Sequence, residues 1–586
     1  MASSNVPAMT HGVKGSDVYD TTGSHLLDLY VMLNRGLDAE SIKAAVKQVV
    51  ATGTIAQDRQ AALEDAFTLA FQTRDVRGGK GERDLFQHLW LALHQWAPSI
   101  AVATLPLVPE YGYWRDVFDI AAAGTAGPDS TLQNAAFNVA KTQFLKDEAA
   151  LQTPRPEGAP APTLSLLGKW APREHSNNAA TKAQARLFAQ VLCPGPKSSA
   201  TYRARVSVLN KALNTPEIAM CAKAWSSLNP ATVPGRCLKT KVKGFLNQPV
   251  KGAHGRKAPS TDPDRVACAA RFAEHFAQAA QGKAKVKGAD TVFPHELVGK
   301  IVGHIYANGG HHYGGHGAAL TSEELASVEA QWLSIVDGLK ASGTTLGRSL
   351  AMCDFSGSMG DKMWIAMALG ILIATFNTGP FKDCILTFDS KPTLHRFKAT
   401  TLLGRVSEVI HLAQGTSTDF QAAYNLVLKT MIDSGCPVGS EPKDLIVLTD
   451  MGWDAACGHG MYSSYTGSRY SQATKTKASE THVQIARRAF TKQGELLYGD
   501  GNGWTAPRIV IWNLAASFKD FHATANEDGV VNVSGWSPSL LKTLSANGAD
   551  ALTPAAMLRA QLQDPRYAPV RAAVAAAYAL LPPTPA

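Results

Sequence analysis

Residues 343–548 alternate between short apolar runs and longer helical segments. The runs are apolar on both faces, as in SLAMC, CILTF, DLIVLT, RIVIW and VVNVS. Strands that are buried on both faces belong to parallel sheets covered by helices on either side. This region is therefore predicted to be a doubly wound, Rossmann-like α/β domain, and ligands of such domains bind at the carboxyl ends of the strands.

Oxygen-bearing side chains stand at the ends of two predicted strands and on one nearby loop. Asp354, Ser356 and Ser358 follow SLAMC directly, Asp450 ends DLIVLTD, and Thr418 precedes a predicted helix. Hard cations prefer oxygen ligands, and zinc prefers nitrogen and sulfur. The sequence predicts one divalent cation here, Mg²⁺ in the first place, with Mn²⁺ or Ca²⁺ as alternatives. A capped turn without a metal is the other interpretation.

Residues 21–342 carry apolar residues at three- and four-residue spacing, which is typical of helices. This density of helices predicts an all-α, helical-repeat module, with a closed ring as one arrangement. Residues 1–20 are polar and are predicted to be a disordered lead. Residues 549–586 are rich in Ala and are predicted to form a C-terminal helical tail.

Positive charge is concentrated in the helical region. The whole chain has a formal net charge of +9. Residues 181–260 hold fourteen Lys or Arg residues against one acid, Glu217, a local excess of +13. Such a concentration indicates an anionic partner, and the alternative is a solvated basic face.

The four histidines His304, His311, His312 and His316 lie in or beside a Gly-rich stretch. They could bind a transition metal. No acid or cysteine lies close by in the sequence, so a mobile loop is the favoured interpretation.

The oxygen pattern described above resembles the metal-ion-dependent adhesion site of von Willebrand factor A domains. That family carries DxSxS, then a Thr on a second loop, then an Asp after a later strand, and all five positions match in order. The resemblance implies a von Willebrand A domain over residues 343–548. It also implies an open coordination position that takes a carboxylate or another anion from a partner protein.

Further phrases extend the resemblance. They are RGGKGER (77–83), PEYGYWRD (109–116), SLLGKW (165–170) and KAKVKGADTVFPHEL (283–297). With them, residues 25–545 resemble an uncharacterised family, domain of unknown function 2828. Its layout is similar to that of TROVE proteins, the Ro autoantigen group, in which a ring of helical repeats binds single-stranded RNA ends and structured small RNAs.

The expected function is that of a non-enzymatic, RNA-binding protein with a metal-dependent partner site. The predicted RNA contacts are basic residues of three kinds. Three belong to the RGGKGER turn, one adjoins Trp170, and five cluster within short spans that lack nearby acids; in that order they are Arg77, Lys80, Arg83, Lys169, Arg203, Arg205, Lys239, Lys241 and Lys243. RGGKGER lacks the spacing of a phosphate-binding loop and is read as an exposed turn. A protein-interaction scaffold without nucleic acid is the alternative, and an enzyme is the least favoured class.

The compartment is inferred from the cysteines and the N-terminus. The eight cysteines form no CxxC pair, and several lie in apolar strand-like runs, where a reduced thiol behaves as a small hydrophobe. The N-terminus lacks the layout of a secretory signal. We expect a cytoplasmic protein that does not associate with a membrane.

Overall fold

The computed structural model describes residues 7–51, 56–124, 130–158, 160–252, 255–308, 319–388, 391–412, 418–454, 480–546 and 551–581. The chain divides into two compact units. The sheet unit comprises Met1–Asp38 and Ala279–Asp564, and the helical unit comprises Ala39–Gln278 and Pro565–Ala586. Each unit is thus built from two separate stretches of the chain.

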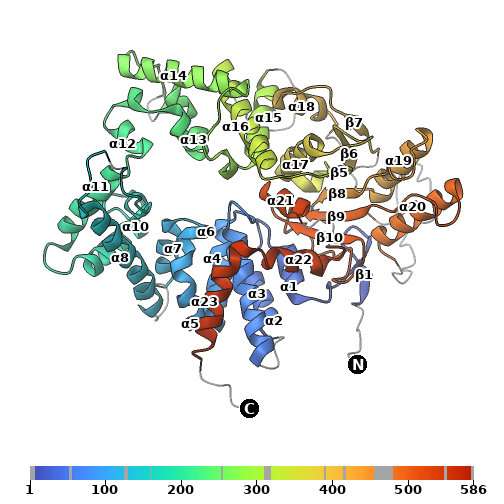
Figure 1. Cartoon of the computed structure of the whole chain (residues 1–586), viewed down its shortest axis with the longest axis horizontal. Helices are drawn as coiled ribbons and strands as arrows, with labels where there is room; N and C mark the ends of the chain where they lie inside the picture. Colours follow the sequence, from blue (N-terminus) through green and yellow to red (C-terminus); the bar gives the residue numbers. More distant parts are fainter. Residues whose placement is uncertain are drawn as a thin grey trace. The chain divides into compact units, whose positions relative to one another are not determined.

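A six-stranded sheet forms the centre of the sheet unit (Figure 1). Its order is β10-β9-β8-β5-β6-β7, and all neighbours are parallel except β6 and β7. The strands are β5 (Ser349–Asp354), β6 (Cys384–Phe388), β7 (Leu394–Arg396), β8 (Asp444–Thr449), β9 (Arg508–Asn513) and β10 (Val530–Ser534). The five parallel strands are buried along their whole length, which explains their uniformly apolar sequences.

Helices cover the sheet. They are α15 (Pro294–Ala307), α16 (Ser322–Ala341), α17 (Met363–Phe376), α18 (Leu402–Val409), α19 (Phe420–Asp433), α20 (His482–Tyr498), α21 (Ser539–Ala546) and α22 (Pro554–Leu562). The step from β5 to β6 and the later return from β6 and β7 to β8 run in opposite directions across the sheet, so right-handed crossovers place α17 and α19 on opposite faces. The contacts agree, since α17 packs with α15 and α18, whereas α19 packs with α20.

By length and composition alone, the helical stretch Gly357–Phe376 could cross a membrane, the one such stretch among the described residues. It consists of a short 3₁₀ segment, η5 (Gly357–Lys362), followed by α17. Almost all residues of α17 are buried, and the helix contacts β5, β6, β8 and α15. Its apolar composition is therefore accounted for by its position in the core of the sheet unit.

The N-terminal stretch belongs to the sheet unit through long-range contacts. A hairpin of β1 (Met9–His11) and β2 (Asp17–Tyr19) is followed by α1 (His25–Met32). The backbone N–H of Tyr19 donates to the carbonyl of Phe521 at 2.8 Å. After α1, the Asn34 amide donates to the carbonyl of Asn513 at 3.2 Å and to the hydroxyl of Ser534 at 3.0 Å. These bonds fix residues 9–34 at the carboxyl ends of β9 and β10.

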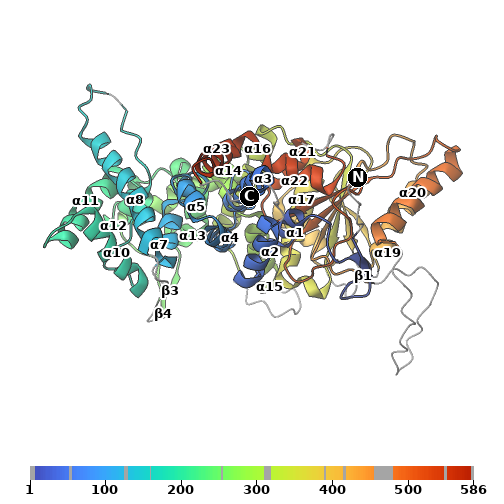
Figure 2. The ribbon, with the colours of Figure 1, turned by 90° about the horizontal axis from the view of Figure 1, so that it is seen from below.

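The helical unit contains packed helices and one short hairpin, β3 (Val250–Gly252) with β4 (Gly255–Lys257). Its α-helices are α2 (Ala39–Ala51), α3 (Ala56–Arg74), α4 (Arg83–Trp96), α5 (Pro98–Thr104), α6 (Val108–Tyr111), α7 (Trp114–Ala123), α8 (Ser130–Gln152), α9 (Leu167–Trp170), α10 (Ala179–Leu192), α11 (Ser198–Ala212), α12 (Pro216–Cys221), α13 (Gly235–Phe245), α14 (Pro263–Ala280) and α23 (Ala568–Tyr578). Figure 2 shows α8, α10 and α11 side by side, in agreement with their contacts.

The C-terminal helix α23 packs on α3 and α5 (Figure 1). Just before it, Arg566 and Tyr567 both bind the carboxylate of Asp75, which is fully buried. The Tyr111 hydroxyl donates to the carbonyl of Arg566 at 2.6 Å. The C-terminal tail is therefore fixed to the first helices of the unit by polar bonds as well as apolar packing.

The predicted layout, a mostly helical N-terminal region and a C-terminal sheet with helices, is confirmed, although the sheet is mixed because β7 is antiparallel. The compact units do not follow the predicted divisions at residues 342 and 548. Residues 279–342 pack with the sheet unit, because the apolar faces of α15 and α16 meet α17 and α18. Within residues 1–20, predicted to be disordered, residues 9–19 form a hairpin held by contacts from distant parts of the chain.

Replacing Asp75 by Ala tests the docking of α23. The Arg566 guanidinium and the Tyr567 hydroxyl would lose their acceptor in a buried position. Because Arg566 is about one-third exposed, we expect a loss of about 2–3 kcal/mol in unfolding free energy, measured by urea denaturation. The exposed pair Arg83–Asp84 provides the control, and Asp84→Ala should change stability by less than about 1 kcal/mol. Equal effects of the two changes would contradict the docking role.

Candidate metal centre in the sheet unit

The site lies where the strand order reverses. From β5 the chain passes outward to β6 and β7, and it then returns to β8 on the other side of β5. Loops diverge at such a point and leave a crevice at the carboxyl ends of the strands, where ligands of open α/β sheets bind. Asp354 is the last residue of β5, and Asp450 directly follows β8. The pairing of these strands brings the two carboxylates to the same edge.

The turn after β5 presents one carboxylate and two hydroxyls. Asp354 is fully buried, and its Oδ1 accepts a bond from the Ser356 backbone N–H at 2.9 Å. The hydroxyls of Ser356 and Ser358 lie 3.1 Å apart. Ser356 is buried and Ser358 is exposed, so the turn runs from the interior to the surface. The two hydroxyl oxygens can therefore face one bound ion that remains accessible from solvent.

Thr418 and Asp450 complete the set from two other loops. The Thr418 backbone exchanges hydrogen bonds with Asp454, at 2.6 Å to the carboxylate and 3.0 Å from the Asp454 N–H. This exchange ties the loop before α19 to the loop after β8. Asp450 is fully buried, and its Oδ1 accepts from the Gly452 N–H at 3.1 Å. Its Oδ2 is buried and has no hydrogen-bond partner among the described residues.

The electrostatics of the site favour a cation. Burial, together with the nearby charge of Asp450, raises the pKa of Asp354 to about 7, although hydrogen bonds from Ser356 and Thr449 act in the opposite direction. Two buried carboxylates at one strand edge repel each other. A dication between the loops would remove this repulsion and would satisfy the unpartnered Asp450 oxygen.

A buried aromatic group positions the Asp354 carboxylate. The Trp453 ring stacks between Phe420 and His522, with centroid separations of 4.5 Å and 3.7 Å. Its indole N–H donates to the Thr449 hydroxyl at 3.1 Å, and that hydroxyl donates to Asp354 Oδ2 at 3.0 Å. Thr449 is thus a positioning residue that the sequence analysis missed. The phrase TDMGWD, in which it precedes Asp450, was the available signal.

Met451 adopts a left-handed conformation with φ of +75°, which is uncommon for a residue other than Gly. Its N–H donates to the Thr449 hydroxyl at 3.1 Å, and its carbonyl accepts from His522 Nε2 at 2.8 Å. The strain, on the order of 1–3 kcal/mol, is offset by these bonds. The backbone therefore turns sharply after Asp450 and fixes the position of its side chain.

These residues suit a hard cation. The donors are carboxylate and hydroxyl oxygens, which match Mg²⁺, Mn²⁺ or Ca²⁺. Among the described residues, no group of three or more His, Cys, Asp or Glu could hold a metal ion. His304 lies in α15, where its Nδ1 accepts from the Leu320 N–H at 3.0 Å, and His311, His312 and His316 lie outside the described residues.

Several of the predicted RNA contacts are ion-paired in the helical unit. Arg203 binds Glu174 at 2.7 Å, Arg205 binds Glu148 at 2.8 Å, and Lys169 binds Glu217 at 2.8 Å. The sequence analysis did not foresee the pairing with Glu148 and Glu174, because both acids lie before residue 181, outside the basic segment. A paired cation attracts a phosphate less strongly than an unpaired one, so these three positions are weaker candidates than the sequence implied.

The RGGKGER turn is a packing element. A Cβ on Gly79 would lie 1.8 Å from the carbonyl oxygen of Gln72, so only glycine fits there. Lys80 is fully buried, and burial lowers the pKa of its ammonium group well below the usual value. Lys80 is therefore not placed to touch a phosphate at the surface. Arg77 and Arg83 are exposed.

Three of the sequence phrases meet at one partly exposed cluster, which we call the Tyr113–Trp170 cluster. The two rings are in edge-to-face contact, with centroids 4.7 Å apart. Arg83 donates to the Tyr113 hydroxyl at 3.1 Å, and the Lys169 ammonium lies 5.5 Å from the Trp170 ring. The neighbouring Tyr111 and Trp114 are buried in the core.

The last three predicted contacts share one helix. Lys239, Lys241 and Lys243 lie on α13, whose buried side consists of Leu238, Val242 and Phe245. Lys241 is exposed, and Lys239 and Lys243 are half-buried. α13 therefore presents a basic face away from the core.

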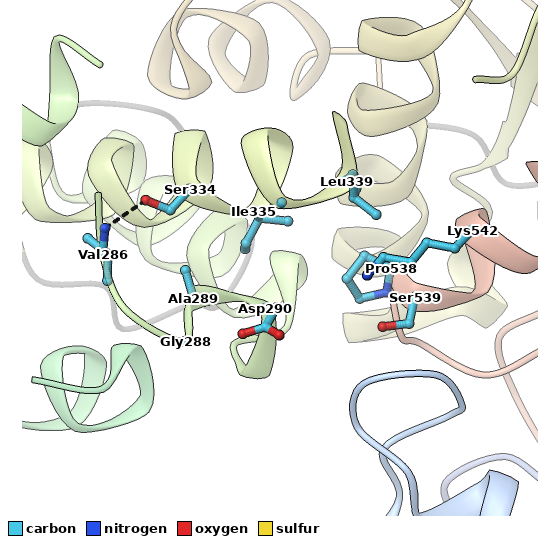
Figure 3. A pocket seen from close by; sticks show the side chains of 11 residues that line it. Val286, Gly288, Ala289, Asp290, Ser334, Ile335, Leu339, Pro538, Ser539 and Lys542 are labelled. Atoms are coloured by element: carbon cyan, nitrogen blue, oxygen red, sulfur yellow. Dashed lines mark hydrogen bonds between the residues drawn. The ribbon is translucent and has the colours of Figure 1, made fainter. Parts of the chain in front are cut away.

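A separate pocket of about 180 Å³ lies in the sheet unit between η4 (Ala289–Thr291), α16 and α21 (Figure 3). The Ser334 hydroxyl accepts from the Val286 N–H at 3.0 Å on its wall. Asp290 and Lys542 are its charged residues. None of the five predicted cation ligands lines it.

Two family models match different stretches of the chain. Residues 348–563 match the family model described as Domain of unknown function (DUF7788). Residues 14–158 match the model described as Domain of unknown function (DUF2828), so the predicted resemblance to that family is confirmed for this stretch.

A relative aligns over nearly the whole chain. It is Uncharacterized protein L728 of Acanthamoeba polyphaga mimivirus, which is 26% identical over 561 residues, 93% of this chain and 85% of that protein. The similarity thus includes both the sheet unit and the helical unit.

The acid stability of the sheet unit should depend on His522. Burial lowers the pKa of His522 to about 3, and its Nδ1 has no acceptor among the described residues. The unfolded chain has the ordinary value of about 6.5, so it binds the extra proton as the pH falls between these values. The contribution of His522 to the unfolding free energy should therefore fall by about 1.4 kcal/mol per pH unit below about pH 6.5, whereas Asp354, whose pKa is raised, contributes in the opposite direction.

The measurement is urea denaturation with a chelator at about pH 7 and about pH 5. His522→Gln keeps an N–H donor for the Met451 carbonyl but cannot titrate, so its unfolding free energy should rise relative to that of the wild type as the pH falls from about 7 to about 5. Identical pH dependences of the wild type and this variant would show that His522 does not govern acid stability.

Proposed function

We propose that residues 343–548 form a von Willebrand factor A-type domain that binds one divalent cation and, through it, an acidic group of a partner protein. The observation that carries the proposal is the pair of buried carboxylates, Asp354 and Asp450, with an Asp450 oxygen that lacks a partner among the described residues. Ser356, Ser358 and Thr418 would supply neutral oxygen ligands. The strand order and the position of these residues at the switch point support the same assignment.

The bound cation would supply a positive charge with an open coordination position. The chain's own residues orient that position toward solvent. Asp354 and Asp450 are buried at the carboxyl edge of the sheet, whereas Ser358 lies at the surface. A carboxylate that approaches from outside would meet the exposed side of the ion. This arrangement suits binding, and we propose Mg²⁺, with Mn²⁺ and Ca²⁺ as alternatives.

A thermal melt of the full chain tests the cation site. Mg²⁺ or Mn²⁺ in excess should raise the melting temperature relative to chelator, because a ligand that binds the folded state stabilises it. Asp450→Asn should abolish this shift and should also raise the melting temperature in chelator, since one of two repelling charges is removed. Asp361→Asn makes the same chemical change at an exposed position of η5 and should leave the shift intact. No shift in the wild type would exclude the cation site.

A second function, RNA binding by the helical unit, is proposed on a separate observation. The Tyr113–Trp170 cluster combines partly exposed rings with Arg83 and Lys169, and single-stranded RNA is bound by such stacking and basic groups. The basic face of α13 and the TROVE-like order of helical region and A-type domain support it further. Seven cysteines in the described residues are free thiols, which fits a cytoplasmic RNA-binding protein.

Charge reversal on α13 tests this second function. Changing Lys239, Lys241 and Lys243 to Glu should weaken binding of single-stranded RNA and reduce its salt dependence by about 0.7 in log–log slope per lost phosphate contact. Lys382, Lys429 and Lys492 are exposed in the sheet unit, and their reversal is the charge-matched control. The readout is an anisotropy titration with excess duplex DNA at several salt concentrations. RNA binding that duplex DNA removes completely would favour a protein scaffold.

A further inference from the structure

The N-terminal hairpin places a lysine directly on the candidate cation site. The Lys14 ammonium donates to the hydroxyl of Ser358 at 3.0 Å and to that of Thr418 at 3.1 Å. These hydroxyls belong to separate loops of the chain, so the ammonium bridges the site. Lys14 is far away in sequence, in a segment that the sequence analysis assigned no role.

The tip of the hairpin is fixed so that Lys14 points into the site. The Gly12 N–H donates to the Ser16 carbonyl at 2.8 Å and closes the tip. The Val13 N–H donates to Asp520 Oδ2 at 3.2 Å, and Gly15 forms an isolated bridge with Asp454. Asp454 is also the residue that binds the Thr418 backbone. The hairpin therefore contacts the same loops that carry the cation ligands.

Lys14 and a metal ion need the same electron pairs. A lysine ammonium is a compact positive charge with three donors, and it binds hydroxyl oxygens through the lone pairs that a hard cation would use. Its charge also acts on the carboxylate of Asp520, to which the hairpin is hydrogen-bonded. The two cations are thus alternative occupants of one place.

We propose that Lys14 is a built-in competitor for the divalent cation, so that the hairpin closes the site when no metal is bound and is released when the metal binds. This inference rests on the cation site proposed above and adds its regulation. Because linkage is reciprocal, anything that draws the hairpin away would tighten metal binding, and metal binding would expose the hairpin tip. A partner's acidic group would then reach the ion from the solvent-exposed side, where Ser358 lies.

Direct titration of the full chain with Mn²⁺, followed by the electron paramagnetic resonance signal of free Mn²⁺, tests the competition. Lys14→Met removes the charge and keeps the aliphatic chain, so the dissociation constant should fall about tenfold, the order expected for losing charged hydrogen bonds. Lys14→Arg retains a competing cation and should bind Mn²⁺ more weakly than Lys14→Met. Lys362→Met is the control, because Lys362 contacts Ser517 at 3.3 Å and neither of the two hydroxyls.

Hydrogen exchange of the backbone amides of residues 12–16 gives a second readout. In the wild type these amides should exchange faster with saturating Mn²⁺ than with chelator, because the tip is released. Equal and measurable Mn²⁺ affinities of the wild type and Lys14→Met would overturn the competition while leaving the cation site in place. Absence of Mn²⁺ binding in every form would overturn the site itself. Exchange that slows on Mn²⁺ addition would also contradict the proposal, since the hairpin would then close over the metal.

Discussion

The repulsion between two buried carboxylates, Asp354 and Asp450, is the constraint on which the site of this protein depends. Both side chains are fully buried at the ends of adjacent strands, where water cannot screen their charges. Such a pair persists in a folded protein only when positive charge or hydrogen-bond donors compensate it. The surrounding loops supply donors to both carboxylates, and the Lys14 ammonium binds the nearby hydroxyls of Ser358 and Thr418.

Buried side chains of the sheet unit fix the position of the Asp354 carboxylate. The chain of hydrogen bonds from Trp453 through Thr449 to Asp354 begins in a stack of rings that crosses from α19 to the loop before β10. Met451 also donates a hydrogen bond to Thr449, and its backbone adopts an unfavourable left-handed conformation. An arrangement this rigid fixes ligand positions before a cation binds, which is how a small set of oxygens can select one geometry.

The sequence predicted the sheet and the candidate ligands because both depend on local patterns. Short apolar runs such as DLIVLT that alternate with helical segments indicate buried strands, and a residue like Asp450 at the end of such a strand lies at the carboxyl edge of the sheet. The position of the N-terminal hairpin could not be predicted in this way. Its contacts are with residues such as Asp520 and Phe521, hundreds of positions away, and nothing in residues 1–20 indicates them.

The ion pairing and burial of several predicted RNA contacts could not be predicted from the sequence for a related reason. Counting charge along residues 181–260 shows the basic residues of the segment but misses acids that other segments bring to them, such as Glu148 and Glu174. Counting charges along the sequence also does not reveal burial, and Lys80, one of the predicted contacts, is fully buried. Conversely, the contact between Tyr113 and Trp170 could not be predicted from the sequence. The two residues belong to separate phrases and meet because α7 packs against α9.

One proposed cation site, with oxygen ligands from three loops and a contact from a lysine of a fourth segment, is therefore the central feature of the sheet unit. The most direct measurement is anomalous scattering from crystals of the full chain grown with Mn²⁺. We expect one anomalous peak between the hydroxyl groups of Ser356, Ser358 and Thr418. The Lys14 ammonium should then be displaced from Ser358 and Thr418. Crystals grown with Mn²⁺ in which no peak lies there, and in which Lys14 still contacts Ser358 and Thr418, would contradict it.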